Sequence, residues 1–397
     1  MNNNTFQPGA GRALFFSTAA FAVSFAVWGL IAALAPTFTQ IYNLSATEKS
    51  LLIAIPVLLG SIGRIFAGMA ADRFGGRVVF SALLIFSAIP AVAIAFSTSF
   101  AQLLVFGLLL GVAGTTFPVG VGFASKWFSK EKQGTALGIY GAGNVGQSIA
   151  VFFAPVLALW FGDWRTVFFV FAAITLIWGF VFYFLARDAA GGAQPKTLAE
   201  NLSVLKRSKT AWILSLFYFL TFGGFVALAL YLPTFLREIF NLSATDAGAR
   251  TAGFVLLATL MRPVGGILAD KIGGAKVLMV VFAAIAALSL LLSFTTIVLF
   301  TIGALGCAAA LGLGNGAVFK LVPQYFPNET ATVTGLVGAF GGLGGFFPPL
   351  ELGFVKEATG SYTIGFVLLS LFALVCLAVN YFSFLRGEKT AEADLAF

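Results

Sequence analysis

Two arginines that lie inside long apolar stretches are the residues best suited to chemistry in this chain. Arg64 is the fourteenth residue of a stretch that begins at Leu51, and Arg262 is the fourteenth of one that begins at Ala249. If each stretch crosses a membrane, its polar end lies about 8 residues further, or about 12 Å along a helix, which exceeds the reach of an arginine side chain. An arginine at that depth costs about 2.5–3.5 kcal/mol on insertion scales, so we expect a functional role.

These two cations have no acidic partner in the sequence. No aspartate or glutamate lies at a matching depth in any apolar stretch, and Glu351 is expected near the outer end of its own stretch. Two unpaired guanidinium groups that face one cavity need an anion as their partner. The planar donors of a guanidinium match a small planar oxyanion such as nitrate, nitrite or a carboxylate. We therefore expect the substrate to be a small anion.

Lys320 is a third cation, about two residues before the end of its apolar stretch. One interpretation makes it a proton-coupling residue, because burial and nearby positive charge favour a neutral amine in the empty site and a bound anion favours its protonation. Anion and proton would then bind cooperatively. The other interpretation is a lysine whose side chain extends to the membrane interface. Both interpretations stay open at this point.

The composition indicates which elements position these residues. The chain of 397 residues is 59% hydrophobic and 10% charged, whereas a soluble protein has about 25% charged residues. Apolar runs of about 18 residues or more recur, which is typical of membrane-spanning helices. We expect helices over residues 13–36, 49–70, 78–97, 101–124, 134–160, 165–186, 210–236, 249–269, 276–295, 298–322, 331–356 and 362–385.

The sequence also excludes several kinds of chemistry. It contains no histidine, so histidine-based metal sites and proton relays are excluded. Cys307 and Cys376 lack a C-x-x-C spacing and are expected to be buried thiols. No phosphate-binding G-x-x-x-x-G-K-[ST] motif is present, so ATP is not the expected energy source. We expect no metal, no cofactor and no enzyme activity.

The lysines and arginines predict the orientation in the membrane. With the N-terminus inside, 15 of them fall on the cytoplasmic face and 5 on the outer face. Basic residues accumulate on the cytoplasmic side of membrane proteins, so we expect a multi-pass protein of the cell membrane with both termini in the cytoplasm. The formal charge of +8 is then a topology signal, and nucleic acid is not an expected partner.

An internal repeat predicts the architecture. The pentapeptide NLSAT at 43–47 recurs 198 residues later, and the same offset relates Arg64 to Arg262 and Asp72 to Asp270. We expect an all-α membrane protein with twelve transmembrane helices in two pseudo-symmetric six-helix bundles, as in transporters that rock around a midplane site. The bundles are expected over residues 1–188 and 210–397, joined by a cytoplasmic linker over residues 189–209.

The loop that follows Arg64 resembles that of a known superfamily. Residues 68–77, GMAADRFGGR, are similar to the loop between helices 2 and 3 of the major facilitator superfamily, and residues 266–276 are similar to its degenerate copy between helices 8 and 9. This resemblance covers nearly the whole chain and implies the major facilitator fold. It implies that the loop clamps neighbouring helices and helps to gate transport through Asp72, Arg73, Arg77 and Asp270. The alternative is a charged turn that is merely solvated.

Two glycine-rich stripes point to one family within this superfamily. They run over residues 138–146 and 335–345, and we expect them to face each other. A dinucleotide fingerprint would need a preceding strand, whereas small residues at three- and four-residue spacing allow close contact between membrane helices. The stripes, an asparagine in the first one and the two arginines are similar to the signature of the nitrate/nitrite porter family.

This family resemblance implies a set of binding residues. It assigns the anion site to Arg64, Arg262, Asn144, Tyr218, Phe117, Gly143 and Gly342. The alternative for the glycines is helix packing without substrate contact, and any one of 46 phenylalanines can equally face lipid or the core. Phe346 and Phe347 follow the second stripe where some family members have polar residues, so polar coordination from that helix is in doubt.

The resulting prediction is a secondary active transporter that moves nitrate, and nitrite as a second substrate, by alternating access. Proton-coupled uptake is the favoured mechanism, and nitrate/nitrite antiport is the alternative. An exchanger of formate or oxalate is the third candidate. A membrane sensor would need a soluble signalling domain, for which the polar segments are too short. The expected partners are the small anion, protons and the lipid bilayer, and the protein is expected to act as a monomer.

Overall fold

The computed structural model describes residues 8–189, 203 and 208–386. The regular structure within these ranges is helical, and 12 helical segments are long and apolar enough to cross a membrane. Large apolar side chains point outward, as at Leu159 and Trp160, which are 84% and 78% exposed. Such a surface suits lipid rather than water. The chain is therefore a multi-pass membrane protein, and the predicted fold class is confirmed.

The first six spans use ten helical elements, because two spans are each interrupted by a short 3₁₀ turn. These are α1 (Ala10–Tyr42), α2 (Ala46–Phe74), α3 (Gly76–Ala95), α4 (Phe100–Leu110), η1 (Gly111–Thr115), α5 (Thr116–Ser125), α6 (Gln133–Gly141), η2 (Ala142–Asn144), α7 (Val145–Phe161) and α8 (Trp164–Leu185) in chain order, with α4 to α5 and α6 to α7 each forming one span apart from these interruptions.

The second six spans contain two π-helical segments. In chain order they are α10 (Lys209–Tyr218), η3 (Phe219–Gly223), α11 (Gly224–Phe240), α12 (Ala244–Ile272), α13 (Gly274–Leu291), α14 (Ile297–Tyr325), α15 (Thr330–Thr359), α16 (Thr363–Asn380) and η4 (Tyr381–Leu385). The segment η3 joins α10 to α11 within one span, and η4 continues α16.

The repeated NLSAT pentapeptide ends one helix and starts the next. Asn43 and Asn241 adopt left-handed backbone conformations, with φ of 51° and 54°, directly after α1 and α11. Asparagine is one of the few residues that tolerate this helix-ending conformation. Two residues later, the hydroxyls of Ser45 and Ser243 accept a hydrogen bond from a backbone N–H in the first turn of the next helix, as N-cap residues do. Helix α1 therefore extends to Tyr42, beyond the predicted end at residue 36.

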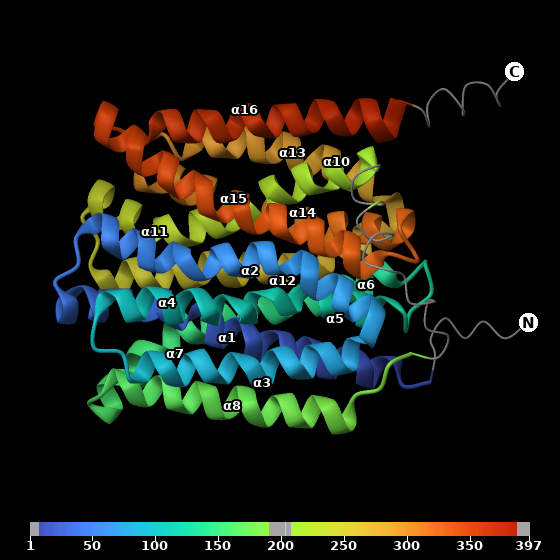
Figure 1. The fold of residues 1–397 in the computed structure, drawn as a ribbon. Helices are drawn as coiled ribbons and strands as arrows, with labels where there is room; N and C mark the ends of the chain where they lie inside the picture. The colour runs from blue at the N-terminus through green and yellow to red at the C-terminus, as the bar shows by residue number, and fades with distance from the viewer. Residues whose placement is uncertain (1–7, 190–202, 204–207, 387–397) are drawn as a thin grey trace, which may run out of the picture.

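The two six-helix bundles lie side by side, with α3 and α8 at one edge of the molecule and α13 and α16 at the other (Figure 1). Contact between the bundles runs along α2 with α15 and along α12 with α6. The two helices that carry the arginines, α2 and α12, therefore both lie at the boundary between the bundles.

One face of the molecule collects basic residues, and we call it the basic face. Helix α1 begins there and η4 ends there, at the right-hand side of Figure 1. Helices α2 and α12 also end at this face, and each is followed by a glycine with positive φ, Gly75 at 89° and Gly273 at 92°. Glycine adopts this conformation without steric cost. The two turns are again 198 residues apart, so the repeat extends to the backbone of the loops.

Candidate functional site

The two arginines come together in the interior, at the boundary between the bundles. Arg64 on α2 is 1% exposed and Arg262 on α12 is 2% exposed. The Cζ atom of Arg64 lies 5.8 Å from the ring centroid of Phe117 and 5.2 Å from that of Phe222. The Cζ atom of Arg262 lies 5.8 Å and 5.6 Å from the same two rings. Both guanidinium groups thus share two aromatic neighbours, as cation–π pairs do.

The arginines are held by neutral acceptors. Arg64 donates from Nε to the carbonyl oxygen of Gly114 at 2.9 Å and from Nη1 to that of Gly338 at 2.7 Å. Arg262 donates from Nη1 to the carbonyl oxygen of Gly141 at 3.2 Å and from Nη2 to the hydroxyl of Tyr218 at 2.8 Å. Each arginine therefore binds one group of its own bundle and one glycine carbonyl of the opposite bundle.

Interruptions of the helices supply two of these three carbonyl groups, whereas that of Gly338 lies within the helix α15. Gly114 lies in the 3₁₀ turn η1, and Gly141 is the last residue of α6, directly before the 3₁₀ turn η2. A change from α-helical to 3₁₀ hydrogen bonding alters which carbonyls are used within the helix. Side chains can then bind carbonyl groups that a regular helix would satisfy internally.

Two positive charges are thus buried without a carboxylate. Within the described ranges, neither Arg64 nor Arg262 forms a salt bridge. Carbonyl dipoles and ring faces compensate these charges only partly, because burying an ion without a counter-ion is costly. An anion placed between the two guanidinium groups would remove that cost.

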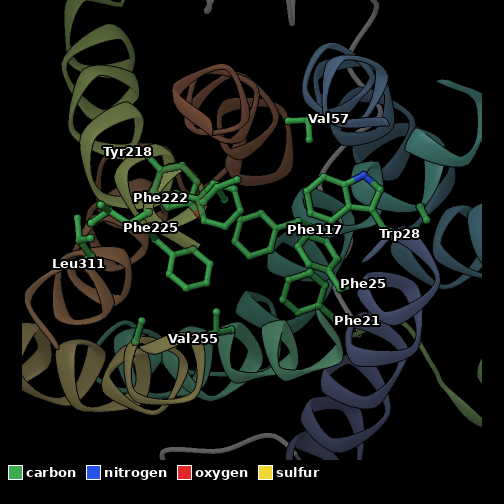
Figure 2. Close-up of a cluster of buried hydrophobic side chains, with 14 of the residues drawn as sticks. Phe21, Phe25, Trp28, Val57, Phe117, Tyr218, Phe222, Phe225, Val255 and Leu311 are labelled. Atoms are coloured by element: carbon green, nitrogen blue, oxygen red, sulfur yellow. The ribbon is translucent and has the colours of Figure 1, made fainter. Parts of the chain in front are cut away.

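Flat aromatic rings pack together beside the arginines. The rings of Phe117 and Tyr218 are nearly parallel, with an interplanar angle of 8° and centroids 6.3 Å apart. Tyr218 is also parallel to Phe222, at 9° and 5.0 Å, and Phe319 packs edge-on against both Phe117 and Tyr218. Figure 2 shows the rings of Phe117, Tyr218 and Phe222 converging from the two bundles. We call Arg64, Arg262, Phe117, Tyr218 and Phe222 the central site.

Asn144 ends the turn η2 and is 1% exposed. Among the described residues, neither the nitrogen nor the oxygen of its side-chain amide has a hydrogen-bond partner. A buried amide without partners costs free energy. The part of Asn144 in substrate binding stays a prediction.

The glycine stripes do not face each other, in contrast to the prediction. Each stripe packs against the arginine-bearing helix of the opposite bundle: a Cβ atom on Gly138 would lie 2.7 Å from Cα of Pro263, and one on Gly335 would lie 2.6 Å from the carbonyl oxygen of Arg64. A Cβ atom on Gly143 would meet the ring of Phe21 on α1. One on Gly342 would overlap Ser61 on α2. These glycines therefore lie at helix contacts, and their part in substrate binding stays a prediction.

Lys320 does not lie with the arginines. Its Nζ atom is 2.8 Å from a carboxylate oxygen of Asp270 and also donates to the carbonyl oxygen of Lys130. Asp270 in turn accepts hydrogen bonds from the backbone N–H groups of Gly134 and Thr135, at 3.1 and 2.7 Å, and from the Thr135 hydroxyl at 2.7 Å. The lysine thus belongs to a cluster at the basic face, where α12 meets the start of α6.

Asp72 makes the corresponding contact from the N-terminal bundle to the C-terminal bundle. Near the end of α2, it accepts hydrogen bonds from the backbone N–H and the hydroxyl of Thr332, near the start of α15, at 2.9 and 2.8 Å. Negative charge near a helix start is favoured by the helix dipole. We call the contacts of Asp72 and Asp270 the basic-face clasps, because each joins one bundle to the other.

The two arginines of the loop make local contacts. Arg73 lies over the ring of Phe74, at 5.1 Å, and Arg77 lies over the ring of Tyr183, at 5.3 Å. The backbone N–H of Arg77 donates to Asp188 at 3.1 Å. These contacts stay within the N-terminal bundle, whereas the two acids reach across to the other one.

Asn315 on α14 is a polar residue of this region that sequence reasoning missed. It is 2% exposed, and its side-chain oxygen has no hydrogen-bond partner within the part of the chain that the structure describes. It lies one helical turn before Phe319, on the same face, and Phe319 contacts two rings of the central site. The available signal was the repeat, because Asn315 lies 198 residues after Phe117.

Comparisons with known proteins agree with this arrangement. A family model described as Major Facilitator Superfamily matches residues 16–349 and 214–395. The chain is similar to the solved structure of the human organic anion transporter MFSD10, with a TM-score of 0.77 and 17% identity over 94% of this chain and 100% of the other. It is also similar to the fucose transporter FucP in the outward conformation, with a TM-score of 0.74 and 18% identity over 94% of this chain and 99% of that one. These two likenesses concern the fold.

Curated relatives are closer in sequence. The chain is 44% identical to the "Nitrite extrusion protein" of Bacillus subtilis, over 88% of each chain. It is 38% identical to the "Probable nitrate transporter NarT" of Staphylococcus epidermidis, over 92% of this chain and 94% of the relative. It is 39% identical to the "Probable nitrate/nitrite transporter NarK2" of Mycobacterium tuberculosis, over 97% and 98%. Together with the paired arginines and glycine stripes, these matches show that the chain belongs to the nitrate/nitrite porter family of the Major Facilitator Superfamily.

Proposed function

We propose that this protein is a secondary active transporter of nitrate and nitrite, and that it binds the anion at the central site. The observation that carries the proposal is the pair of buried arginines, one from each bundle, that share two aromatic neighbours and have no carboxylate partner among the described residues. Relatives named for nitrate and nitrite transport support this choice of anion.

The contacts of the arginines suggest how the anion acts on the bundles. In the structure, Arg64 and Arg262 each donate to a glycine carbonyl of the opposite bundle. A planar oxyanion offers stronger, charge-assisted acceptors to the same donors. We propose that it replaces these carbonyls, lies flat against the ring of Phe117 or Phe222, and exchanges direct contacts between the bundles for contacts through the ligand.

Two buried amides complete the proposed anion site. Asn144 comes from the N-terminal bundle and Asn315 from the C-terminal one, and the side-chain NH₂ group of each is the kind of donor that an anion needs. The Nδ2 atom of Asn144 has no hydrogen-bond partner among the described residues. The repeat places Gly342 at the position equivalent to Asn144. The second half thus lacks an amide on α15, and we propose that Asn315 on α14 supplies it.

Alternating access requires that the clasps open. We propose that the basic face lies on the cytoplasmic side of the cell membrane and that both termini lie on that side. This face holds most of the lysines and arginines, which accumulate on the cytoplasmic side of membrane proteins. Asp72 and Asp270 then hold the cytoplasmic ends of the bundles together. Opening toward the cytoplasm breaks both clasps, and the protein does this as a monomer.

The energy source has two candidates. Nitrate entry into a negative-inside cell is opposed by about 2.3 kcal/mol per 100 mV, so uptake needs either protons or an exchanged anion. Proton coupling would be carried by Lys320, whose ion pair with Asp270 places it in one of the two clasps between the bundles. The central site contains no acid among the described residues, which favours nitrate/nitrite exchange instead.

Reconstitution in proteoliposomes tests the proposal. The purified protein should accumulate nitrate when a pH gradient or internal nitrite is imposed, and formate or oxalate should compete weakly. Transport driven only by the pH gradient identifies the symporter, and transport driven only by internal nitrite identifies the antiporter. If neither nitrate nor nitrite enters under any gradient, the proposal is wrong.

A further inference from the structure

A cavity lies at the basic face, away from the central site. It has a volume of about 300 Å³ and lies between the start of α1, the residues after α5 and the end of α8. Its lining includes Arg12, Phe16, Trp127, Leu185 and Arg187. These side chains combine two positive charges with apolar surface, a combination that the transport mechanism does not use.

The two arginines of this cavity are available to a ligand. Both Arg12 and Arg187 are exposed, and no salt bridge to either is found among the residues that the structure describes. The guanidinium of Arg12 lies over the ring of Phe16, at 5.5 Å. The neighbouring acid, Asp188, binds the backbone N–H of Arg77 and does not line the cavity. The cavity is therefore positively charged.

Trp127 adds a hydrogen-bond donor without an acceptor. Among the residues that the structure describes, its buried indole Nε1 has no hydrogen-bond partner, and an indole N–H can only donate. A ligand that pairs with it must therefore carry an acceptor. Together with two guanidinium groups, whose planar donors match phosphate oxygens, this donor calls for an oxyanion such as a phosphate.

Apolar surface continues from the cavity toward the lipid. Phe16 and Leu185 line the cavity, and their sequence neighbours Phe15 and Phe184 are 63% and 73% exposed. A ligand that fills the cavity and follows this surface needs an anionic head and apolar chains. Anionic phospholipids meet both conditions, and basic pockets between transmembrane helices bind such head groups.

We infer that this cavity binds the head group of an anionic phospholipid from the adjacent leaflet. The phosphate contacts Arg12 and Arg187 and accepts a hydrogen bond from Trp127, and the acyl chains lie along α1 and α8 beside Phe15 and Phe184. The bound lipid joins the start of the first span to the end of the sixth. The inference rests on this cavity alone and is independent of the proposed anion transport.

Lipid retention by the purified full chain tests this inference. The protein in detergent is mixed with phosphatidylglycerol or with phosphatidylcholine of the same acyl chains, and bound lipid is counted by native mass spectrometry. The wild-type protein should retain phosphatidylglycerol in preference to phosphatidylcholine. Retention should fall at least about tenfold in Arg12→Gln/Arg187→Gln, and about fivefold in Trp127→Phe, which keeps an aromatic ring.

Matched variants separate site binding from charge alone. Lys209→Gln/Lys276→Gln removes two exposed charges from the same face of the other bundle and should retain lipid like the wild type. Arg12→Lys/Arg187→Lys keeps the charge and should lose less lipid than the glutamine variant. Equal retention of both lipids, or equal loss in the Lys209 and Lys276 control, would overturn the inference. Displacement of phosphatidylglycerol by millimolar inorganic phosphate would also overturn it, because free phosphate would then be the ligand.

Discussion

The Nη1 atom of Arg64 donates a 2.7 Å hydrogen bond to the carbonyl oxygen of Gly338, so a buried cation of one bundle is bound to the backbone of the other. Arg262 makes the reciprocal contact with Gly141. In this structure the two arginines therefore connect the bundles directly. Any anion that binds both arginines must compete with these contacts, which links ligand binding to the relative position of the bundles.

Replacement of Asn144 by alanine should weaken nitrate binding by about 1–3 kcal/mol, because an amide that pairs with the ligand is lost. The thermal stability of the empty protein should not fall, since the side-chain amide of Asn144 has no partner there. Isothermal titration with nitrate and a thermal-shift assay measure the two effects. Asn380→Ala is the control, because it removes a buried amide that donates to the carbonyl oxygen of Ala275 and is not part of the central site. This variant should leave nitrate affinity unchanged. Normal nitrate binding by Asn144→Ala, with a loss of stability, would instead assign this residue to helix packing.

Asn315 should behave like Asn144 if it supplies the second amide. Asn315→Ala should lower nitrate affinity by about 1–3 kcal/mol. Asn315→Asp should lower it further, because a carboxylate near Arg262 would occupy the position of the anion and repel it. Nitrate titration of the two variants checks the order. If Asn315→Asp bound nitrate as tightly as the wild type, Asn315 would lie outside the anion site.

Loss of the basic-face clasps should favour the state that is open at that face. Asp72→Ala/Asp270→Ala removes the hydrogen bonds to Thr332, Gly134 and Thr135, each worth about 1–3 kcal/mol where a charged group takes part. Spin labels on cysteines that replace Arg12 and Lys276, one in each bundle, should report a new population at longer distance.

Asp188→Ala is the control for the clasps, because Asp188 is an acid of the same face that binds within its own bundle. It should leave the distance distribution of the spin labels as in the parent protein. An unchanged distribution in the double aspartate variant would show that other contacts keep this face closed.

Lys320→Gln tests proton coupling. If the ion pair with Asp270 carries the proton-dependent step, nitrate accumulation driven by a pH gradient should be lost in proteoliposomes, while exchange against internal nitrite persists. Lys320→Arg keeps a charge that does not titrate in proteins and should be equally uncoupled. Accumulation that survives unchanged in Lys320→Gln would exclude Lys320 as the coupling residue.

The helices and the depth of the arginines could be predicted because apolar length and the cost of a buried charge act locally along the chain. The repeat added the pairing of Arg64 with Arg262 and of Asp72 with Asp270. The twelve observed spans overlap the predicted ones, and the differences lie at polar ends such as that of α1, where the cap rather than hydropathy ends the helix.

The contacts between side chains and neighbouring helices could not be predicted in the same way. Depth along a helix does not say which neighbour a side chain meets. The sequence left Lys320 either near the arginines or at the membrane interface, and neither interpretation identified Asp270 as its partner. The carbonyl acceptors at Gly114 and Gly141 depend on 3₁₀ turns that leave no clear signal in a glycine-rich apolar sequence. The prediction that the two glycine stripes face each other was wrong for the same reason. Small residues indicate that a helix makes a close contact, but they do not identify the helix that it contacts.

The central claim is that the two arginines bind the anion through their planar donors. A lysine keeps the charge but cannot present two parallel N–H groups to one oxyanion. Arg64→Lys and Arg262→Lys should therefore lose nitrate transport although the net charge is unchanged. Arg165→Lys, at an exposed position that pairs with Asp163, is the matched control and should transport normally.

Nitrate titration of purified Arg64→Lys and Arg262→Lys by calorimetry tests this claim most directly, with thermal unfolding as the check on folding. The arrangement of both guanidinium groups over Phe117 and Phe222 predicts that each folded variant binds nitrate about 10- to 100-fold more weakly, as expected for the loss of a charge-assisted hydrogen bond. Near-normal nitrate affinity in both lysine variants would contradict the account.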